Sequence, residues 1–245
     1  MRILVANANT TEAITALCAD AARAAAGPRT EILPATPRFG PAVIATRAED
    51  AVAAHGLLSL LAEHAGRVDA VLLAVSLDTA LEAARQMMPC PVVGMTEAAC
   101  VTALLLGGRF GLVTTGGVEP YRERIARHGL SARLAGLRGI AATPQDALRD
   151  PAAVEAALDG AIAEVVAEGA DAVVLGGAAL AGLAPRLQPR AAVPLLDGIA
   201  CGVRLLEGLA ALGSPKQAAG SYAAPRGRES LGLDPALAAL LRGGG

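Results

Sequence analysis

The sequence predicts an α/β protein built from two pseudo-symmetric lobes, each a short parallel sheet flanked by helices. The first observation is an internal repeat: residues 69–75 read DAVLLAV and residues 171–177 read DAVVLGG, 102 positions later. The second is that the strand-like runs are apolar throughout and alternate with helical spacing, which is typical of parallel strands covered on both faces. We therefore expect two Rossmann-like lobes with an active cleft between them, and the strand-end residues Val75 and Gly177 facing that cleft.

Composition and charge limit the core and the partners. Hydrophobic residues make up 53% of the 245 residues but aromatic residues only 2%, so we expect a core of alanine, leucine and valine. The formal net charge is −2 and no basic stripe interleaves with aromatics, which argues against a nucleic-acid partner. No apolar run reaches the roughly 18 residues of a membrane span, and the N-terminus reads as a strand rather than a signal peptide. We expect a cytoplasmic protein with no membrane partner.

Histidine, lysine and cysteine give no sign of a metal or a cofactor. The three histidines, His55, His64 and His128, have no acidic or cysteine residue at ligand spacing, so we expect solvent-facing or structural roles. Lys216 is the only lysine and follows a Gly-Ser-Pro loop, where a solvated surface role is expected and a Schiff base is not. The cysteines show no CxxC spacing and are expected to be free thiols: Cys18, Cys90, Cys100 and Cys201.

The first half of the chain predicts four strands separated by loops and helices. Residues 2–5 form an apolar run that ends in the polar turn 7–11, and helical spacing follows until Gly27-Pro28. Residues 31–33 predict a second strand, and the loop 35–41 after it contains two prolines that exclude a helix. The remaining elements of this half are a helix over about 49–64, a strand at 69–75, a helix over 81–88 and a strand at 91–94.

The second half repeats this order. Residues 110–113 predict a strand, and after its turn Glu119-Pro120 opens a helix with proline in a tolerated first-turn position. We expect residues 1–96 together with about 214–245 to form the N-terminal lobe, and residues 97–213 to form the C-terminal lobe. The remaining elements are a helix from Asp150-Pro151 to about 169, strands at 171–177 and 193–196, and helices over 198–212 and 234–241.

The carboxyl ends of the strands place small, hydroxylated or glycine-rich segments at the cleft. The turn 7–11 offers hydroxyls and amides at a helix start, where the helix dipole favours an anion such as a carboxylate. Alternatively, Thr10 or Thr11 caps the helix and the asparagines serve the turn; the two roles are compatible. Thr114-Thr115-Gly116-Gly117 is the matching turn, whose glycines allow a ligand close to the backbone. Neither GxGxxG nor GxxxxGKS/T occurs, so a nucleotide is not expected.

Ser76, Asp78 and Thr79 place two hydroxyls and a carboxylate after the third strand. A buried Asp78 would act as an acid or a base, because burial raises the pKa of a carboxyl group toward neutrality. Alternatively, Asp78 or Thr79 starts the helix that follows. The equivalent stretch of the second lobe, 178–180, contains no ionisable group, so any chemistry is asymmetric between the lobes.

Two further sets of residues have both a chemical and a structural interpretation. Cys100 and Cys201 occupy equivalent repeat positions inside helices, where a thiol pair either transfers protons or fills core. Four arginines either grip a carboxylate through paired hydrogen bonds or lie on the surface: Arg38, Arg47, Arg85 and Arg122.

Six segments in collinear order resemble the aspartate/glutamate racemase superfamily, and within it most of all the hydantoin racemase and allantoin racemase branch. The segments span almost the whole chain and are 2–11, 35–42, 91–99, 109–115, 171–183 and 194–198. The resemblance implies a two-lobed α/β fold, a cofactor-independent isomerase, a homo-oligomer, and a small carboxylate, amino-acid or hydantoin-type substrate. Superfamily racemases move a proton at carbon with two cysteines on opposite sides of the substrate, one removing a proton and the other supplying one.

Other residues occupy the positions of those two cysteines in this chain. In the superfamily the cysteines follow the third strand of each lobe, in stretches resembling A-C-F-x-D-P-G-L and G-C-A-G. Here residues 74–81 read AVSLDTAL and residues 176–179 read GGAA, so Val75 and Gly177 stand at the cysteine positions. Three interpretations follow: an isomerase with a non-standard site, a decarboxylase or lyase of the same superfamily, and a catalytically inactive relative that binds a small molecule.

In the first interpretation Ser76, Asp78 or a displaced cysteine carries the proton transfer. We expect Ser76 and Asp78 to be the catalytic residues, with no metal, no cofactor and a small-molecule partner. The substrate-binding residues expected from the turns and strand ends are Asn7, Thr10, Thr11, Thr79, Thr114, Thr115, Gly177 and Ala178.

Overall fold

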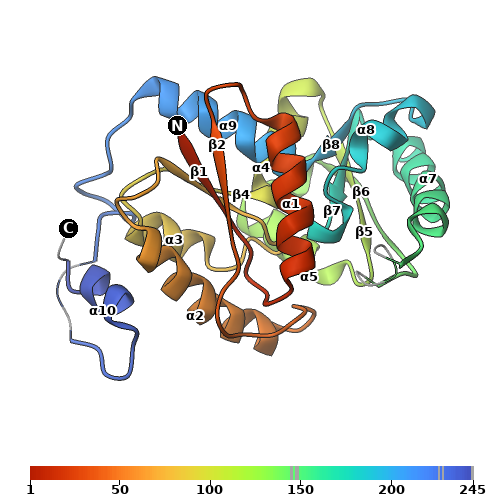
Figure 1. Cartoon of the computed structure of the whole chain (residues 1–245). Coiled ribbons are helices and arrows are strands. Elements are labelled where there is room, and N and C mark those ends of the chain that lie inside the picture. The colour runs from red at the N-terminus through yellow and green to blue at the C-terminus, as the bar shows by residue number, and fades with distance from the viewer. Residues whose placement is uncertain (144–145, 147–148, 226, 228, 244–245) are drawn as a thin grey trace.

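The chain forms two four-stranded parallel sheets joined by helices, as Figure 1 shows for the computed structural model. The structure describes residues 1–143, 146, 149–225, 227 and 229–243. The first sheet has the order β2-β1-β3-β4 and the second the order β6-β5-β7-β8, so the two sheets have the same topology. This confirms the predicted α/β fold. The strands are β1 (Arg2–Ala6), β2 (Glu31–Ala35), β3 (Ala70–Leu73), β4 (Val92–Gly94), β5 (Phe110–Thr115), β6 (Leu134–Ile140), β7 (Ala172–Gly176) and β8 (Leu195–Asp197).

Helices pack on the sheets and connect their strands. Where a range was predicted, the bounds agree with it to within a few residues; α4 was expected only as a helix containing Cys100, and the short α8 was not predicted. None of the helices in the described ranges combines the length and the hydropathy that crossing a bilayer requires. The helices are α1 (Glu12–Ala25), α2 (Arg47–His64), α3 (Leu81–Met87), α4 (Met95–Leu106), α5 (Glu119–Arg127), α7 (Pro151–Ala167), α8 (Ala184–Leu187), α9 (Gly198–Leu212) and α10 (Pro235–Leu241).

The aspartates of the internal repeat have the same structural task in both lobes. Asp69 precedes β3, and its Oδ2 accepts a hydrogen bond of 2.6 Å from the backbone N–H of Arg2. Asp171 precedes β7, and its Oδ2 accepts from the N–H groups of Gly108 and Arg109 at 2.7 and 3.0 Å. Each carboxylate thus ties the start of the third strand of its sheet to the start of the first. The repeat is therefore explained by sheet assembly, independently of any chemistry at the cleft.

Helices α4 and α9 interlock the two lobes. Each follows the last strand of one sheet, yet α4 also packs against β7 of the second sheet and α9 packs against α1 and β3 of the first. Gly202 of α9 lies so close to β3 that a Cβ there would be 2.4 Å from Leu72 Cδ1. Near the C-terminus, α10 packs on α2 and buries Leu237 and Ala238 beside the first sheet. The division at 97–213 stays a prediction, since α9 contacts both sheets.

Candidate active site between the lobes

A cavity of about 410 Å³ lies at the carboxyl ends of both sheets. Its lining comes from the turns after β1 and β5, the loops after β3 and β7, the segment before α2 and the first turn of α5. This is the position predicted for the cleft. The described lining residues are Asn9, Thr11, Ile14, Ala42, Val43, Ile44, Ala45, Val75, Ser76, Leu77, Thr115, Gly116, Gly117, Pro120, Tyr121, Ala142, Thr143, Gly177, Ala178 and Ala179.

The two strand-end positions of the repeat share this cavity. Val75 follows β3, Gly177 follows β7, and both line it. Directly after them, Ser76 Oγ accepts a hydrogen bond of 2.9 Å from the backbone N–H of Ala178, which joins the loops of the two lobes. The backbone φ of Gly177 is 143°, a conformation that side-chain-bearing residues rarely adopt.

The structure brings five of the expected site residues to the cavity and places five elsewhere. Those that line it are Thr11, Ser76, Thr115, Gly177 and Ala178. Those outside its lining have partners within the protein: the N–H of Thr10 donates to the Pro41 carbonyl, and Thr79 Oγ1 donates to Asp50 Oδ1 at 2.5 Å. The other three are Asn7, Asp78 and Thr114, all buried.

Asn7 acts as a support for Asn9, which was not among the residues expected from the sequence. Asn7 Oδ1 accepts from the backbone N–H of Asn9 at 3.1 Å, so its Nδ2 is the donor to Asn9 Oδ1 at 2.9 Å. The backbone N–H of Thr11 donates to the same Asn9 oxygen at 2.9 Å. Because two donors occupy this oxygen, Asn9 has its amide N–H groups left to offer a ligand in the cavity.

Asp78 holds the Ser76 turn, residues 76–79, on the N-terminus of α4. Its carboxylate is fully buried and accepts from the backbone N–H groups of Thr96 at 3.0 Å and Glu97 at 2.9 Å. Thr96 Oγ1 donates in turn to the Ser76 carbonyl at 2.6 Å. Asp78 therefore caps α4, not the following helix α3, whose N-cap is Ala80. Burial raises the pKa of Asp78, while the nearby His128 and the hydrogen bonds from the two amides oppose the rise.

Tyr121 is the one ionisable side chain among the described lining residues, and it was not predicted. It lies in the first turn of α5 and is 5% exposed. Burial raises the pKa of its phenol, and hydrogen bonding with Ser76 and Thr114 opposes that rise. The sequence does contain a signal for Tyr121, because its helix begins directly after the Gly116-Gly117 turn and therefore at the end of a strand.

With this geometry in place, comparison with known proteins identifies the family. A family model described as Asp/Glu/Hydantoin racemase matches residues 3–206. The chain belongs to this family. It is 32% identical over 240 residues to the hydantoin racemase of Pseudomonas sp. (strain NS671), covering 95% of each chain. It is 33% identical over 242 residues to the hydantoin racemase of Paenarthrobacter aurescens, covering 94% of this chain and 100% of the relative.

A solved racemase structure agrees with the sequence comparison. Allantoin racemase from Klebsiella pneumoniae superimposes with a TM-score of 0.91 at 33% identity, covering 97% of this chain and 98% of that one. The two-sheet architecture is therefore that of the racemase family. Together these relatives support a racemase-type isomerase as the class of enzyme.

The thiols of this family member lie outside the lining of the cavity. Cys18 Sγ donates a hydrogen bond of 3.7 Å to the carbonyl oxygen of the lining residue Ala178, and burial together with the nearby Asp197 raises its pKa to about 12. Burial also raises the pKa of Cys100, and that of Cys201 to about 11. These thiols are protonated at neutral pH, which favours the structural interpretation given for the pair in α4 and α9.

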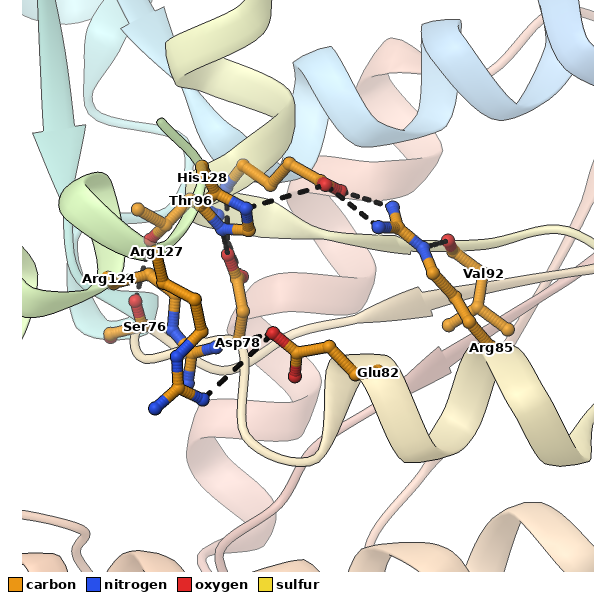
Figure 2. A network of polar contacts seen from close by, with 10 residues as sticks. Ser76, Asp78, Glu82, Arg85, Val92, Thr96, Arg124, Arg127 and His128 are labelled. Carbon is orange, nitrogen blue, oxygen red and sulfur yellow. Dashed lines mark hydrogen bonds and ion pairs between the residues drawn. The ribbon is translucent and has the colours of Figure 1, made fainter. Parts of the chain in front are cut away.

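The arginines that were candidates to bind a substrate carboxylate form ion pairs with glutamates of the same chain. Arg85 binds both carboxylate oxygens of Glu97 and donates from Nε to the Val92 carbonyl at 2.9 Å, as Figure 2 shows. The remaining pairs are Arg38 with Glu63, Arg47 with Glu123 and Arg122 with Glu119.

Lys216 and the possible metal ligands fall elsewhere. Lys216 is partly buried and donates to the Arg85 carbonyl, in contrast to the solvated position expected, because its loop packs beside a second cavity of about 230 Å³. In the part of the chain that the structure describes, no three His, Cys, Asp or Glu side chains are grouped to hold a metal ion.

Proposed function

We propose that this chain is a cofactor-independent racemase-type isomerase that moves a proton at carbon in a hydantoin-type ring. The observation that carries the proposal is the uncharged cavity between the lobes. No Arg, Lys, His, Asp or Glu side chain occurs in its described lining. The volume of about 410 Å³ suits a small ring with a substituent.

An uncharged lining favours a neutral ring over a carboxylate or an amino acid. Burying an anion without a charged or strongly donating partner is costly. A hydantoin ring is neutral and presents carbonyl oxygens and N–H groups, which hydroxyls and amides can satisfy. Relatives named hydantoin racemase and allantoin racemase support the same substrate class. The polar side chains available are Asn9, Thr11, Ser76, Thr115, Tyr121 and Thr143.

The proposed chemistry uses hydroxyl groups at a site without thiols. Removing a proton from the carbon next to a carbonyl leaves negative charge on the carbonyl oxygen, and donors aimed at that oxygen lower the barrier. Val75 and Gly177 have no exchangeable side-chain proton, so we assign to Ser76 and Tyr121 the hydrogen bonds that hold the charge on the carbonyl oxygen. A hydroxide ion from solvent removes the carbon-bound proton as water, and a water molecule returns a proton to the opposite face and restores the hydroxide. The raised pKa keeps Tyr121 a neutral donor at neutral pH. Asp78 supports this pair by holding the Ser76 turn on α4.

Hydrogen exchange in heavy water tests the proposal. The protein is incubated with a 5-substituted hydantoin, with allantoin and with an amino acid, and loss of the carbon-bound proton is followed by NMR. We expect exchange with the ring substrates and a fall of at least about 10²-fold in Ser76→Ala. The exposed Ser131→Ala is the matched control and should exchange at the wild-type rate. Exchange that is equal in Ser76→Ala and wild type would remove Ser76 from the mechanism.

A second function is favoured by the lining of the cavity, which contains Val75 and Gly177, the residues that the family resemblance places at the thiol positions. A relative that binds without catalysis would show no exchange, while a hydantoin would still raise the melting temperature. Release of carbon dioxide from a malonate-type substrate would instead identify a decarboxylase. Either outcome, when the ring substrates show no exchange of the carbon-bound proton, rules out the isomerase.

A further inference from the structure

His128 connects the cavity to a buried polar network. Helix α5 begins at the cavity with Pro120 and Tyr121, and His128 is the residue that caps its other end. In Figure 2 the His128 ring points at the Asp78 carboxylate. A single helix therefore carries a cavity residue at one end and a histidine of the network at the other.

The His128 ring lies between two carboxylates, within ion-pair distance of each but too far for a hydrogen bond. Its Nε2 is 3.6 Å from Asp78 Oδ2 and its Nδ1 is 3.8 Å from Glu97 Oε1. The side chain is 12% exposed, and Nε2 is buried with no hydrogen-bond partner. Both distances are only slightly longer than a hydrogen bond, and a buried ring nitrogen left unpaired is unfavourable. A small shift of α5 toward the Ser76 turn would satisfy it.

The charges around the ring select Asp78 as the partner. Glu97 already has Arg85 as its ion-pair partner. Arg124, one turn before His128 on α5, is turned toward Glu82 of α3 at 3.4 Å. Asp78 accepts two backbone N–H groups, and the Arg124 charge acts on it only from a distance, since among the described residues neither arginine nor lysine forms an ion pair with Asp78. Its carboxylate is therefore the acceptor with most to gain from a donor.

We propose that His128 is a positioning residue of the cavity: ligand binding draws α5 toward the Ser76 turn, and His128 Nε2 then donates a hydrogen bond to Asp78. The movement would hold Tyr121 and Ser76 in place against the ligand, since α5 carries the first and Asp78 holds the turn of the second. The inference rests on the proposed function in taking this cavity as the ligand site.

The small number of histidines makes the bound state testable by NMR. The chain has only three histidines, so a sample labelled with ¹⁵N-histidine shows separate ring signals for His128 and for two internal controls, His55 and His64. On titration with 5-isopropylhydantoin we expect the His128 Nε2 signal to shift while the two control signals stay in place. In Asp78→Asn the His128 shift should be lost. A His128 signal that moves no more than the controls, or that moves equally in Asp78→Asn, overturns the inference.

A second measurement without ligand separates failure of this inference from failure of the proposed function. The chain has two tyrosines and no tryptophan, so Tyr222→Phe leaves Tyr121 as its only source of tyrosine near-UV circular dichroism. In that background His128→Leu should weaken the Tyr121 signal and lower the melting temperature, His128→Gln should restore much of both, and His64→Leu should leave the Tyr121 signal unchanged. If 5-isopropylhydantoin fails to bind, the proposed function fails while this result still decides the positioning role. An unchanged signal in His128→Leu, or equal damage from Gln and Leu, contradicts it.

Discussion

At the scale of single residues, the cavity has a backbone that depends on particular side chains. Asp78 and Ala80 have positive φ values of 47° and 56°, and among the described residues other than glycine these are the two with positive φ. Such conformations cost free energy and are kept where surrounding contacts impose them. At Asp78 the imposing contacts are the two amides of α4. Gly177, at 143°, avoids the cost by lacking a side chain.

This difference predicts how the two strand-end positions accept a thiol. Val75→Cys replaces one small buried side chain by another and should leave the free energy of unfolding nearly unchanged. Gly177→Cys forces a side chain onto a left-handed backbone and should lower it by about 1–3 kcal/mol. Urea denaturation of both variants measures the difference. Equal stability of the two would show that the backbone at Gly177 relaxes freely.

The buried phenol of Tyr121 predicts a pH dependence. Burial raises its pKa above the ordinary value of 10.0. As the pH rises, the phenol therefore loses its proton in the unfolded chain before it does so in the folded protein. Tyr121 makes its full contribution to the free energy of unfolding below about pH 10, and that contribution is lost as the pH rises through the pKa of Tyr121 in the folded protein. In Tyr222→Phe, phenolate absorbance at 295 nm should appear only above pH 10 and rise sharply on unfolding. Ordinary titration near pH 10 in the folded protein would contradict the buried position.

At the scale of elements, the buried strands could be predicted because each is a short apolar run between turn residues. The edge strand β6 could not, because its sequence LAGLRGI is interrupted by two glycines and an arginine. The turns that line the cavity could be predicted, because they come directly after the carboxyl ends of predicted strands. The segment 42–45 could not be predicted to lie there, since only the folded chain brings it to those ends.

The cap of α4 could not be predicted from the sequence either, because Asp78 accepts a hydrogen bond from the amide of Thr96, which lies 18 residues later in the chain. Local patterns suggested that Asp78 caps the adjacent α3. In the fold, Gly94 leaves the room for the contact, since a Cβ there would lie 2.3 Å from Asp78 Cγ. A long-range cap of this kind requires knowledge of which strand ends are neighbours.

Removing this cap should loosen α4 at its first turn. Asp78→Ala leaves two buried N–H groups without an acceptor, so we expect the free energy of unfolding to fall by about 1–3 kcal/mol. Amide hydrogen exchange at Thr96 and Glu97 should accelerate with it. Asp150→Ala, which removes an exposed cap of α7, is the control and should cost less. Unchanged exchange at Thr96 would contradict the capping role.

At the scale of the whole molecule, two similar lobes enclose one asymmetric cavity. Helix α9 is capped by Asp197, whose Oδ1 accepts from Ile199 and Ala200 at 2.7 and 3.2 Å, whereas α4 is capped from the Ser76 turn. The second lobe thus needs no counterpart of Asp78. The interlocked α4 and α9 hold both sets of strand ends together, and the Ser76–Ala178 hydrogen bond crosses between them. Chemistry at this site depends on both lobes at once.

The most direct measurement is proton exchange at carbon in a variant with all four cysteines replaced by alanine, its fold checked by near-UV circular dichroism. If the hydroxyl groups of Ser76 and Tyr121 support proton exchange with solvent, this variant should exchange the ring proton of a 5-substituted hydantoin in heavy water at close to the wild-type rate, and adding Tyr121→Phe should lower that rate by at least about 10²-fold. Loss of exchange in the folded cysteine-free protein would show that a thiol carries the reaction.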